Sequence, residues 1–150
     1  MQERFETFTV LINRISRDIR RIKNQEMASY HLRSAHVSCL YYIYSLDGVT
    51  SAELCEHCEE DKATISRAVD YLETNGFLLR DTGAKRYKSP LLLTEKGRDT
   101  GKRIAEKIDG VLETISHALT EEERIEFYRS LSTISRSLEA IVQNSEEKEM

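Results

Sequence analysis

Residues 58–87 read CEEDKATISRAVDYLETNGFLLRDTGAKRY, and this stretch decides the fold that the rest of the sequence supports. An acidic turn leads to Asp61, a residue type that commonly caps the N-terminus of a helix. An amphipathic helix follows and ends near Gly76, which can adopt the positive φ of a helix C-terminal turn. The stretch closes with a run of cations at what we expect to be a turn between two strands. This order is typical of a helix-turn-helix followed by a β-hairpin.

The predicted helix after Asp61 has one apolar and one polar face. Ile65, Val69 and Leu72 share the apolar face. The opposite face begins with small and hydrogen-bonding side chains, which let a helix backbone approach the base edges of a DNA major groove. A solvated helix followed by an ordinary hairpin is the simpler alternative. The residues that we expect to contact DNA are Thr50, Ser51, Lys62, Ala63, Thr64, Ser66, Arg67, Lys85, Arg86 and Lys88.

Helices are predicted on both sides of this stretch. Thr50 and Glu53 have the spacing of a capping box, and so do Thr120 and Glu123. Pro90 suits an edge strand because it has no N–H to donate. We predict helices at residues 4–27, 36–46, 50–58, 61–75, 94–118 and 120–142, strands at 77–81 and 87–93, and a frayed polar tail from 144.

Charge is distributed unevenly along the 150 residues, whose net charge is −4. Residues 61–103 carry 10 Lys and Arg against 6 Asp and Glu, whereas residues 104–150 carry 5 against 11. A local positive field is sufficient for phosphate binding, because charges beyond a screening length of about 8 Å contribute little. No apolar run is long enough to span a membrane, and the N-terminus has no apolar signal core. We therefore expect a cytoplasmic protein.

Apolar side chains recur every three or four residues in both terminal helices. This is the pattern of a helix that packs along another helix. The small central block cannot cover both stripes, so we expect two chains to bury them together as a homodimer. The expected dimer-interface residues are Phe5, Phe8, Ile12, Ile15, Ile19, Leu131, Ile134 and Leu138.

Residues 50–98 resemble the winged helix-turn-helix of the MarR family of bacterial transcription regulators. The motifs that carry the resemblance are TSAEL at 50–54, DKATISRAVDYLETNGFLLR at 61–80 and LLLTEKG at 91–97. The helices on either side match the family in layout only. The family's wing commonly places an Asp two residues before its Arg. Here residues 81–88 read DTGAKRYK, which gives Arg86 no such partner.

The resemblance implies a mainly α fold with a small β-hairpin. A winged helix-turn-helix at 35–99 would lie between dimerisation helices at 1–34 and 100–150. It also implies a homodimer that binds a pseudo-palindromic operator in double-stranded DNA. Such proteins are usually repressors that a small anion, a phenolic compound or an oxidant releases from DNA. We expect an effector pocket at His36, Tyr41 and Arg17, with ordinary core and surface roles as the alternative.

The three cysteines leave three interpretations open. His36, Cys39, Cys55 and Cys58 form two pairs with zinc-like spacing in the sequence. The thiols could instead sense an oxidant. The third interpretation is that free cysteines fill the core as small apolar residues. The resemblance favours the third, because the family has small or apolar residues at positions 55 and 58, so we expect no metal and no cofactor.

Two functions of other classes compete with DNA binding. No Ser/His/Asp set, glycine-rich phosphate loop or plausible carboxylate pair marks an active site, so we do not expect an enzyme. A winged helix can also serve protein contacts alone, in which case no salt-dependent DNA binding would be found.

Overall fold

The computed structural model describes residues 2–79, 83 and 86–149; of Gln2, Glu3, Phe5, Arg86 and Glu149 it describes the backbone only. The chain divides into two compact units, Met1–Glu106 and Lys107–Met150. The described elements, in chain order, are α1 (Gln2–Glu26), the 3-10 helix η1 (Ala28–Tyr30), α2 (Ser34–Ser45), α3 (Ser51–Cys58), α4 (Lys62–Thr74), the 3-10 helix η2 (Arg86–Lys88), α5 (Glu95–Ser116) and α6 (Glu121–Glu149). The predicted mainly α fold is confirmed.

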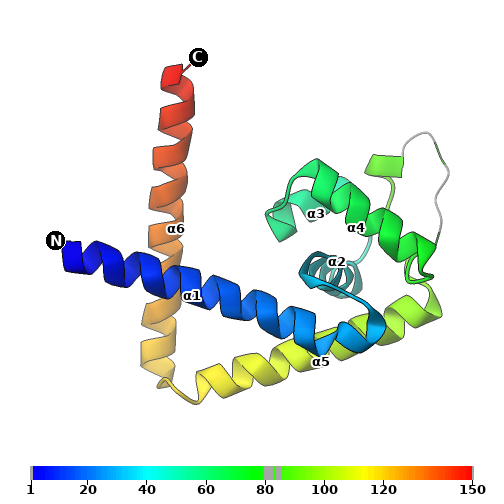
Figure 1. Ribbon diagram of the computed structural model, residues 1–150, viewed down its shortest axis with the longest axis horizontal. Coiled ribbons are helices and arrows are strands. Elements are labelled where there is room, and N and C mark those ends of the chain that lie inside the picture. The colour runs from blue at the N-terminus through cyan, green and yellow to red at the C-terminus, as the bar shows by residue number, and fades with distance from the viewer. Residues whose placement is uncertain (1, 80–82, 84–85, 150) are drawn as a thin grey trace. The chain divides into compact units, whose positions relative to one another are not determined.

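Helix α2 lies at the centre of the first unit, where it contacts α1, α3 and α4 (Figure 1). Each fully buried aliphatic side chain contributes about 1.5–3 kcal/mol relative to an exposed one, so this core holds α3 and α4 in the helix-turn-helix arrangement. The buried side chains of the three helices are Val37, Cys39, Leu40 and Ile43 of α2, Ser51 and Leu54 of α3, and Ile65, Ala68, Val69 and Leu72 of α4.

Side-chain caps fix where α3 and α4 begin, as the sequence predicts. The hydroxyl of Thr50 accepts a hydrogen bond from the Glu53 N–H (3.2 Å), and the Glu53 carboxylate accepts one from the Thr50 N–H (2.8 Å). The Asp61 carboxylate accepts a hydrogen bond from the Thr64 N–H (2.7 Å). These bonds satisfy N–H groups that have no partner inside a helix.

The predicted β-hairpin is not confirmed. Between α4 and α5 the described residues form two isolated antiparallel bridges, Thr50–Pro90 and Leu78–Leu93, in place of strands at 77–81 and 87–93. Residues 86–88 form η2 instead of the start of a strand. The Tyr87 hydroxyl lies 3.4 Å from the Cys55 sulfur, and η2 contacts α3. Residues 80–82, 84 and 85 lie outside the described part of the chain.

A close backbone contact joins the end of α4 to the start of α5. Gly76 has a φ of 77°, which turns the chain after α4 as predicted. A Cβ atom at Gly97 would lie 1.9 Å from the carbonyl oxygen of Phe77, so only glycine fits there. The Thr94 hydroxyl accepts a hydrogen bond from the Gly97 N–H (3.0 Å), which confirms Thr94 as the cap of α5.

The last helix is longer than predicted. We expected α6 to end near residue 142 and its tail to fray, but it continues to Glu149. The Ser145 hydroxyl bonds back to the Ile141 carbonyl (2.9 Å), and the Glu and Lys residues that follow are good helix formers. None of the helices in the described residues, α6 included, is long and apolar enough to cross a membrane.

The contact at Gly97 predicts a large loss of stability on adding one methyl group. We expect Gly97→Ala to lower the free energy of unfolding by roughly 1–3 kcal/mol, because α5 must move away from the Phe77 carbonyl. Urea unfolding followed by circular dichroism measures this change.

Gly110 provides the matched control within α5, since a Cβ there would meet nothing within 4 Å. Gly110→Ala should raise the free energy of unfolding by up to about 1 kcal/mol through helix propensity. Equal stabilities of Gly97→Ala and the unsubstituted protein would show that α5 does not depend on this close approach.

Candidate nucleic-acid interface

Helix α4 presents a small, polar and partly cationic face to solvent. Lys62, Ala63, Ser66 and Arg67 are exposed, and Thr64 is half-buried. Because the apolar side chains of α4 are in the core, the helix cannot rotate without exposing them. Ala63, Thr64 and Ser66 in the first turns of this face have small side chains, so a groove in a partner molecule can approach the backbone closely there.

Arg67 and Asp61 both interact with Thr64 on this face. Arg67 Nη2 donates to the Thr64 hydroxyl at 3.4 Å, a long hydrogen bond that leaves other guanidinium N–H groups available. The Thr64 backbone and side chain donate hydrogen bonds to Asp61 and hold the pKa of its carboxyl below the usual range, with a smaller effect from Arg67. Asp61 therefore stays ionised at neutral pH and remains the cap of α4.

Tyr87 connects the segment after α4 to the helix-turn-helix. The ammonium of Lys62 lies 4.4 Å from the centre of the Tyr87 ring, in a cation–π contact. The Tyr87 hydroxyl meets Cys55 of α3, as described above. The hydrogen bond with Cys55 is the largest cause that raises the pKa of Tyr87. Tyr87 is not among the residues expected from the sequence to contact DNA, although it is an aromatic residue between the cations Arg86 and Lys88.

The remaining residues expected to contact DNA have different surroundings. Thr50 is half-buried and its hydroxyl is engaged with Glu53, and Ser51 is buried. Lys88 is exposed. Lys85 and the side chain of Arg86 lie outside the described residues. The structure thus brings Lys62, Ala63, Thr64, Ser66 and Arg67 together on one helix, with Lys88 in the segment that packs on α3.

The residues expected to form an effector pocket lie in three separate settings. His36 stacks on the Tyr71 ring with a centroid distance of 4.2 Å, and its Nδ1 accepts from the Arg33 N–H. Burial, with a smaller effect of Arg33, lowers the pKa of His36. The Tyr41 ring lies edge-on to Tyr42, and the exposed Arg17 pairs with Asp18 at 3.1 Å.

A cavity of about 360 Å³ lies between α1, α2 and the end of α3. Isoleucines of α1 line it, together with the cations Arg20 and Lys23. Lys23 Nζ donates a hydrogen bond to the Ser38 hydroxyl at 3.0 Å. None of the three expected effector residues lines this cavity. Its lining residues are Ile12, Ile15, Ser16, Ile19, Arg20, Lys23, Ser34, Ala35, Ser38, Cys58 and Glu60.

The cysteines do not gather with histidine as their spacing in the sequence suggested. Cys39 is buried in α2, whereas Cys55 and Cys58 are half-buried. The Cys55 sulfur lies 3.4 Å from the Tyr87 hydroxyl. Within the described residues, no group of three or more His, Cys, Asp or Glu side chains is placed to hold a metal ion, so the zinc interpretation has no support there.

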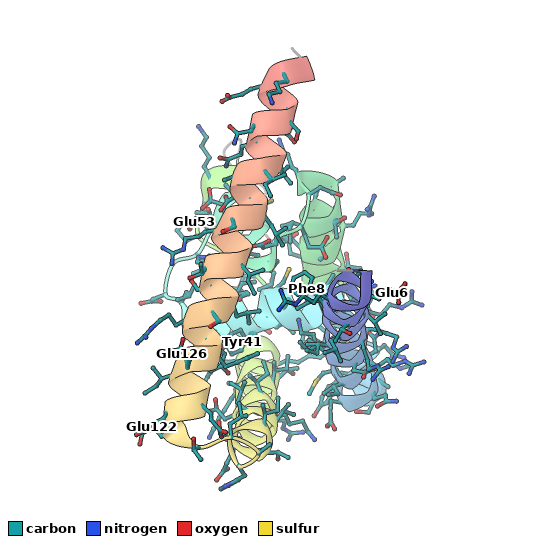
Figure 2. The ribbon with its side chains drawn as sticks, turned by 90° about the vertical axis from the view of Figure 1, so that its left-hand side faces the viewer. Glu6, Phe8, Tyr41, Glu53, Glu122 and Glu126 are labelled. Atoms are coloured by element: carbon teal, nitrogen blue, oxygen red, sulfur yellow. The ribbon has the colours of Figure 1, made fainter. Side chains whose placement is uncertain are left out.

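The two terminal helices expose the apolar stripes predicted for them. Figure 2 shows Phe8 and Glu6 leaving α1 on different sides, as its amphipathic pattern requires. In α1, Phe8, Ile12, Ile15 and Ile19 are all exposed, whereas the side chain of Phe5 lies outside the described residues. In α6, Ile134 and Leu138 are exposed and Leu131 is half-buried.

Comparison with known proteins points to one family. Residues 32–86 match the sequence model of the MarR family. A Bacillus subtilis protein, the uncharacterized HTH-type transcriptional regulator YwoH, is 26% identical over 85 residues, which are 57% of this chain and 62% of that protein. The matched segment thus spans about three fifths of the length of this curated relative.

Solved structures share the fold over most of the chain. MepR of Staphylococcus aureus in complex with DNA has a TM-score of 0.77 and 21% identity, over 87% of this chain and 97% of that one. A MarR family regulator from Neisseria meningitidis has a TM-score of 0.79 and 16% identity, over 95% and 98%. These similarities show the fold, including the winged helix-turn-helix and the long helices on either side.

Proposed function

The chain belongs to the MarR family of transcription regulators, and from this premise we propose that it binds double-stranded DNA and regulates transcription. Family members are regulators and not enzymes. The observation that carries the proposal is the outer face of α4, where Ala63, Ser66 and Arg67 are exposed above a fully buried apolar face. In this proposal α4 enters the major groove and Arg67 bonds to guanine or to a phosphate. Lys62 and Lys88 contact the phosphate backbone, and Ser51, being buried, contributes no side chain.

We further propose that the protein is a homodimer that recognises a pseudo-palindromic operator and represses transcription. The exposed apolar stripes of α1 and of α6 support this proposal, since exposed patches of this kind commonly mark an interface. A two-fold dimer presents two copies of α4, which read two inverted half-sites.

Selection of duplexes from a random DNA pool tests the proposed DNA binding, and we expect an enriched inverted repeat. On the selected duplex, Arg67→Ala should weaken binding by roughly 1–3 kcal/mol, because its bonds to DNA are lost. Fluorescence anisotropy at two salt concentrations measures the affinity and its salt dependence.

Arg136→Ala is the matched control, because Arg136 is also exposed but lies on α6. This variant should bind as the unsubstituted protein does. Unchanged affinity of Arg67→Ala would exclude the proposed position of α4, and a pool without any enriched sequence would exclude the proposed function.

Interruption of the α1 stripe should dissociate the proposed dimer. Ile15→Glu places a charge in the middle of the stripe, so we expect the molar mass in solution to fall by half. Asn13→Glu adds the same charge beside the stripe and should leave the mass unchanged. Light scattering coupled to size-exclusion chromatography measures the molar mass of both variants. A dimeric mass for Ile15→Glu would contradict the proposal that the α1 stripe forms the dimer interface.

We also propose that a small organic anion releases the protein from DNA. The cavity between α1 and α2 supports this, because it combines an apolar wall with the cations of Arg20 and Lys23.

With benzoate as the probe, Lys23→Met should weaken binding about tenfold, the effect of losing one charge-assisted hydrogen bond. Arg17→Met, outside the cavity, is the control in calorimetric titration. If Arg17→Met weakens benzoate binding and Lys23→Met does not, the anion binds at the position expected from the sequence and not in this cavity.

A further inference from the structure

Tyr87 of η2 contacts two helices of the first unit at once. The ammonium of Lys62, the first residue of α4, lies 4.4 Å from the centre of the Tyr87 ring. The Tyr87 hydroxyl lies 3.4 Å from the Cys55 sulfur of α3. Because the Cys55 thiol donates its proton to the Ser51 carbonyl (3.4 Å), the sulfur is left to accept from the Tyr87 hydroxyl. The tyrosine is thus held between α3 and the N-terminus of α4.

The segment that carries Tyr87 is attached to the helix-turn-helix at other points as well. An isolated antiparallel bridge joins Pro90 to Thr50, the residue that caps α3. The Leu91 N–H donates a hydrogen bond to the Val49 carbonyl at 2.9 Å. These contacts position the segment through its main chain, so the side chain of Tyr87 is not needed for that purpose alone. The half-buried ring is available for a second role, which its contact with a cation indicates.

We propose that Tyr87 is a positioning residue for DNA binding, because its ring holds the Lys62 ammonium where a phosphate of the duplex binds. This inference rests on the proposed function, in which Lys62 contacts the phosphate backbone. Tyr87 itself makes no bond to DNA. It acts through Lys62, and the hydrogen bond to Cys55 keeps its ring in place.

A lysine that is held in place before binding loses less freedom when it binds. Lys62 is exposed, and lysine is among the residue types that lose the most rotamer entropy on becoming ordered. The Tyr87 ring attracts the ammonium through its quadrupole and so restricts the side chain in the free protein. The ammonium has three N–H donors, and the ring covers only one side of it. The remaining donors are free to bond to phosphate oxygens while the cation–π contact persists.

A purely packing role for Tyr87 is the alternative, and it makes a different prediction. If the ring only fills space between η2 and α3, its removal should weaken DNA binding equally whether or not the Lys62 charge is present. If the ring positions Lys62, its removal should have no effect once that charge is gone. A double-mutant cycle measures the interaction between the two substitutions and so distinguishes these roles.

The test measures affinity for the duplex selected from the random pool, by fluorescence anisotropy at a series of salt concentrations. Lys62→Met should reduce the slope of log K against log salt concentration by about 0.9, the value for one lost phosphate contact. Tyr87→Leu should weaken binding roughly two- to fivefold, the range of an exposed cation–π contact. Tyr87→Phe keeps the ring and should bind within about twofold of the unsubstituted protein. In the Lys62→Met background, Tyr87→Leu should cause no further loss.

Lys102→Met is the matched control, because Lys102 is also exposed but lies on α5, where it pairs with Glu106 at 3.9 Å. In this background Tyr87→Leu should keep its full effect. Equal losses for Tyr87→Leu in the Lys62→Met and Lys102→Met backgrounds, or an unchanged salt slope for Lys62→Met, would overturn the proposal.

A measurement without DNA separates this proposal from the proposed function. In the nuclear magnetic resonance spectrum of the free protein, the ring current of Tyr87 should shift the ε-protons of Lys62 upfield. The shift should persist in Tyr87→Phe and disappear in Tyr87→Leu. Its absence from the unsubstituted protein would overturn the positioning role even if the protein binds DNA. The shift together with a pool that yields no enriched duplex would instead exclude the proposed function, and the role of Tyr87 with it. If Tyr87→Leu does not fold, the shift in the unsubstituted protein and the salt slope of Lys62→Met still decide the question.

Discussion

The hydroxyl of Thr94 joins the end of α4 to the start of α5, and the arrangement of the first unit depends on this junction. The hydroxyl donates to the Gly76 carbonyl (2.6 Å) while it accepts from the first turn of α5. The Thr94 N–H donates to the Phe77 carbonyl (3.1 Å), against which Gly97 packs without a side chain. Lys96 adds a hydrogen bond to the Asn75 carbonyl (2.8 Å). The end of α4 is therefore held by the beginning of the next helix, which fixes the direction in which its outer face points.

Helices α1 and α4 are both amphipathic, but their apolar faces differ in exposure to solvent. The apolar face of α4 is covered by α2 and α3, whereas the described apolar side chains of α1 face solvent. Among the described residues, the buried hydrophobic side chains all lie between Met27 and Ile104. The first unit thus folds its core without the stripe of α1, and the hydrophobic effect leaves that stripe available for a second chain. This difference is the physical basis of the proposed dimer.

The features that the sequence predicted well depend on neighbours in the chain. The caps at Thr50, Asp61 and Thr120 involve residues three positions apart, so their spacing is visible in the sequence. The β-hairpin is not confirmed: in the described residues its two arms pair at the Leu78–Leu93 bridge and through the bond from the Leu79 N–H to the Leu92 carbonyl. Such pairing depends on partners that are distant in the sequence. The cavity between α1, α2 and the end of α3 could not be predicted for the same reason, since it lies between helices that the chain brings together only on folding. The outer face of α4 could be predicted because helical periodicity alone determines it.

Both helices of the helix-turn-helix have their N-terminal N–H groups capped by carboxylates of the chain itself, Glu53 at Thr50 and Asp61 at Thr64. A helix N-terminus otherwise attracts phosphate through these same N–H groups and the helix dipole. The chain therefore uses part of its own anion-binding capacity to stabilise the fold, and its ionised carboxylates repel a nearby phosphate. A complex of DNA with such capped helices gains less from phosphate contacts at these two N-termini than a complex with uncapped helices would.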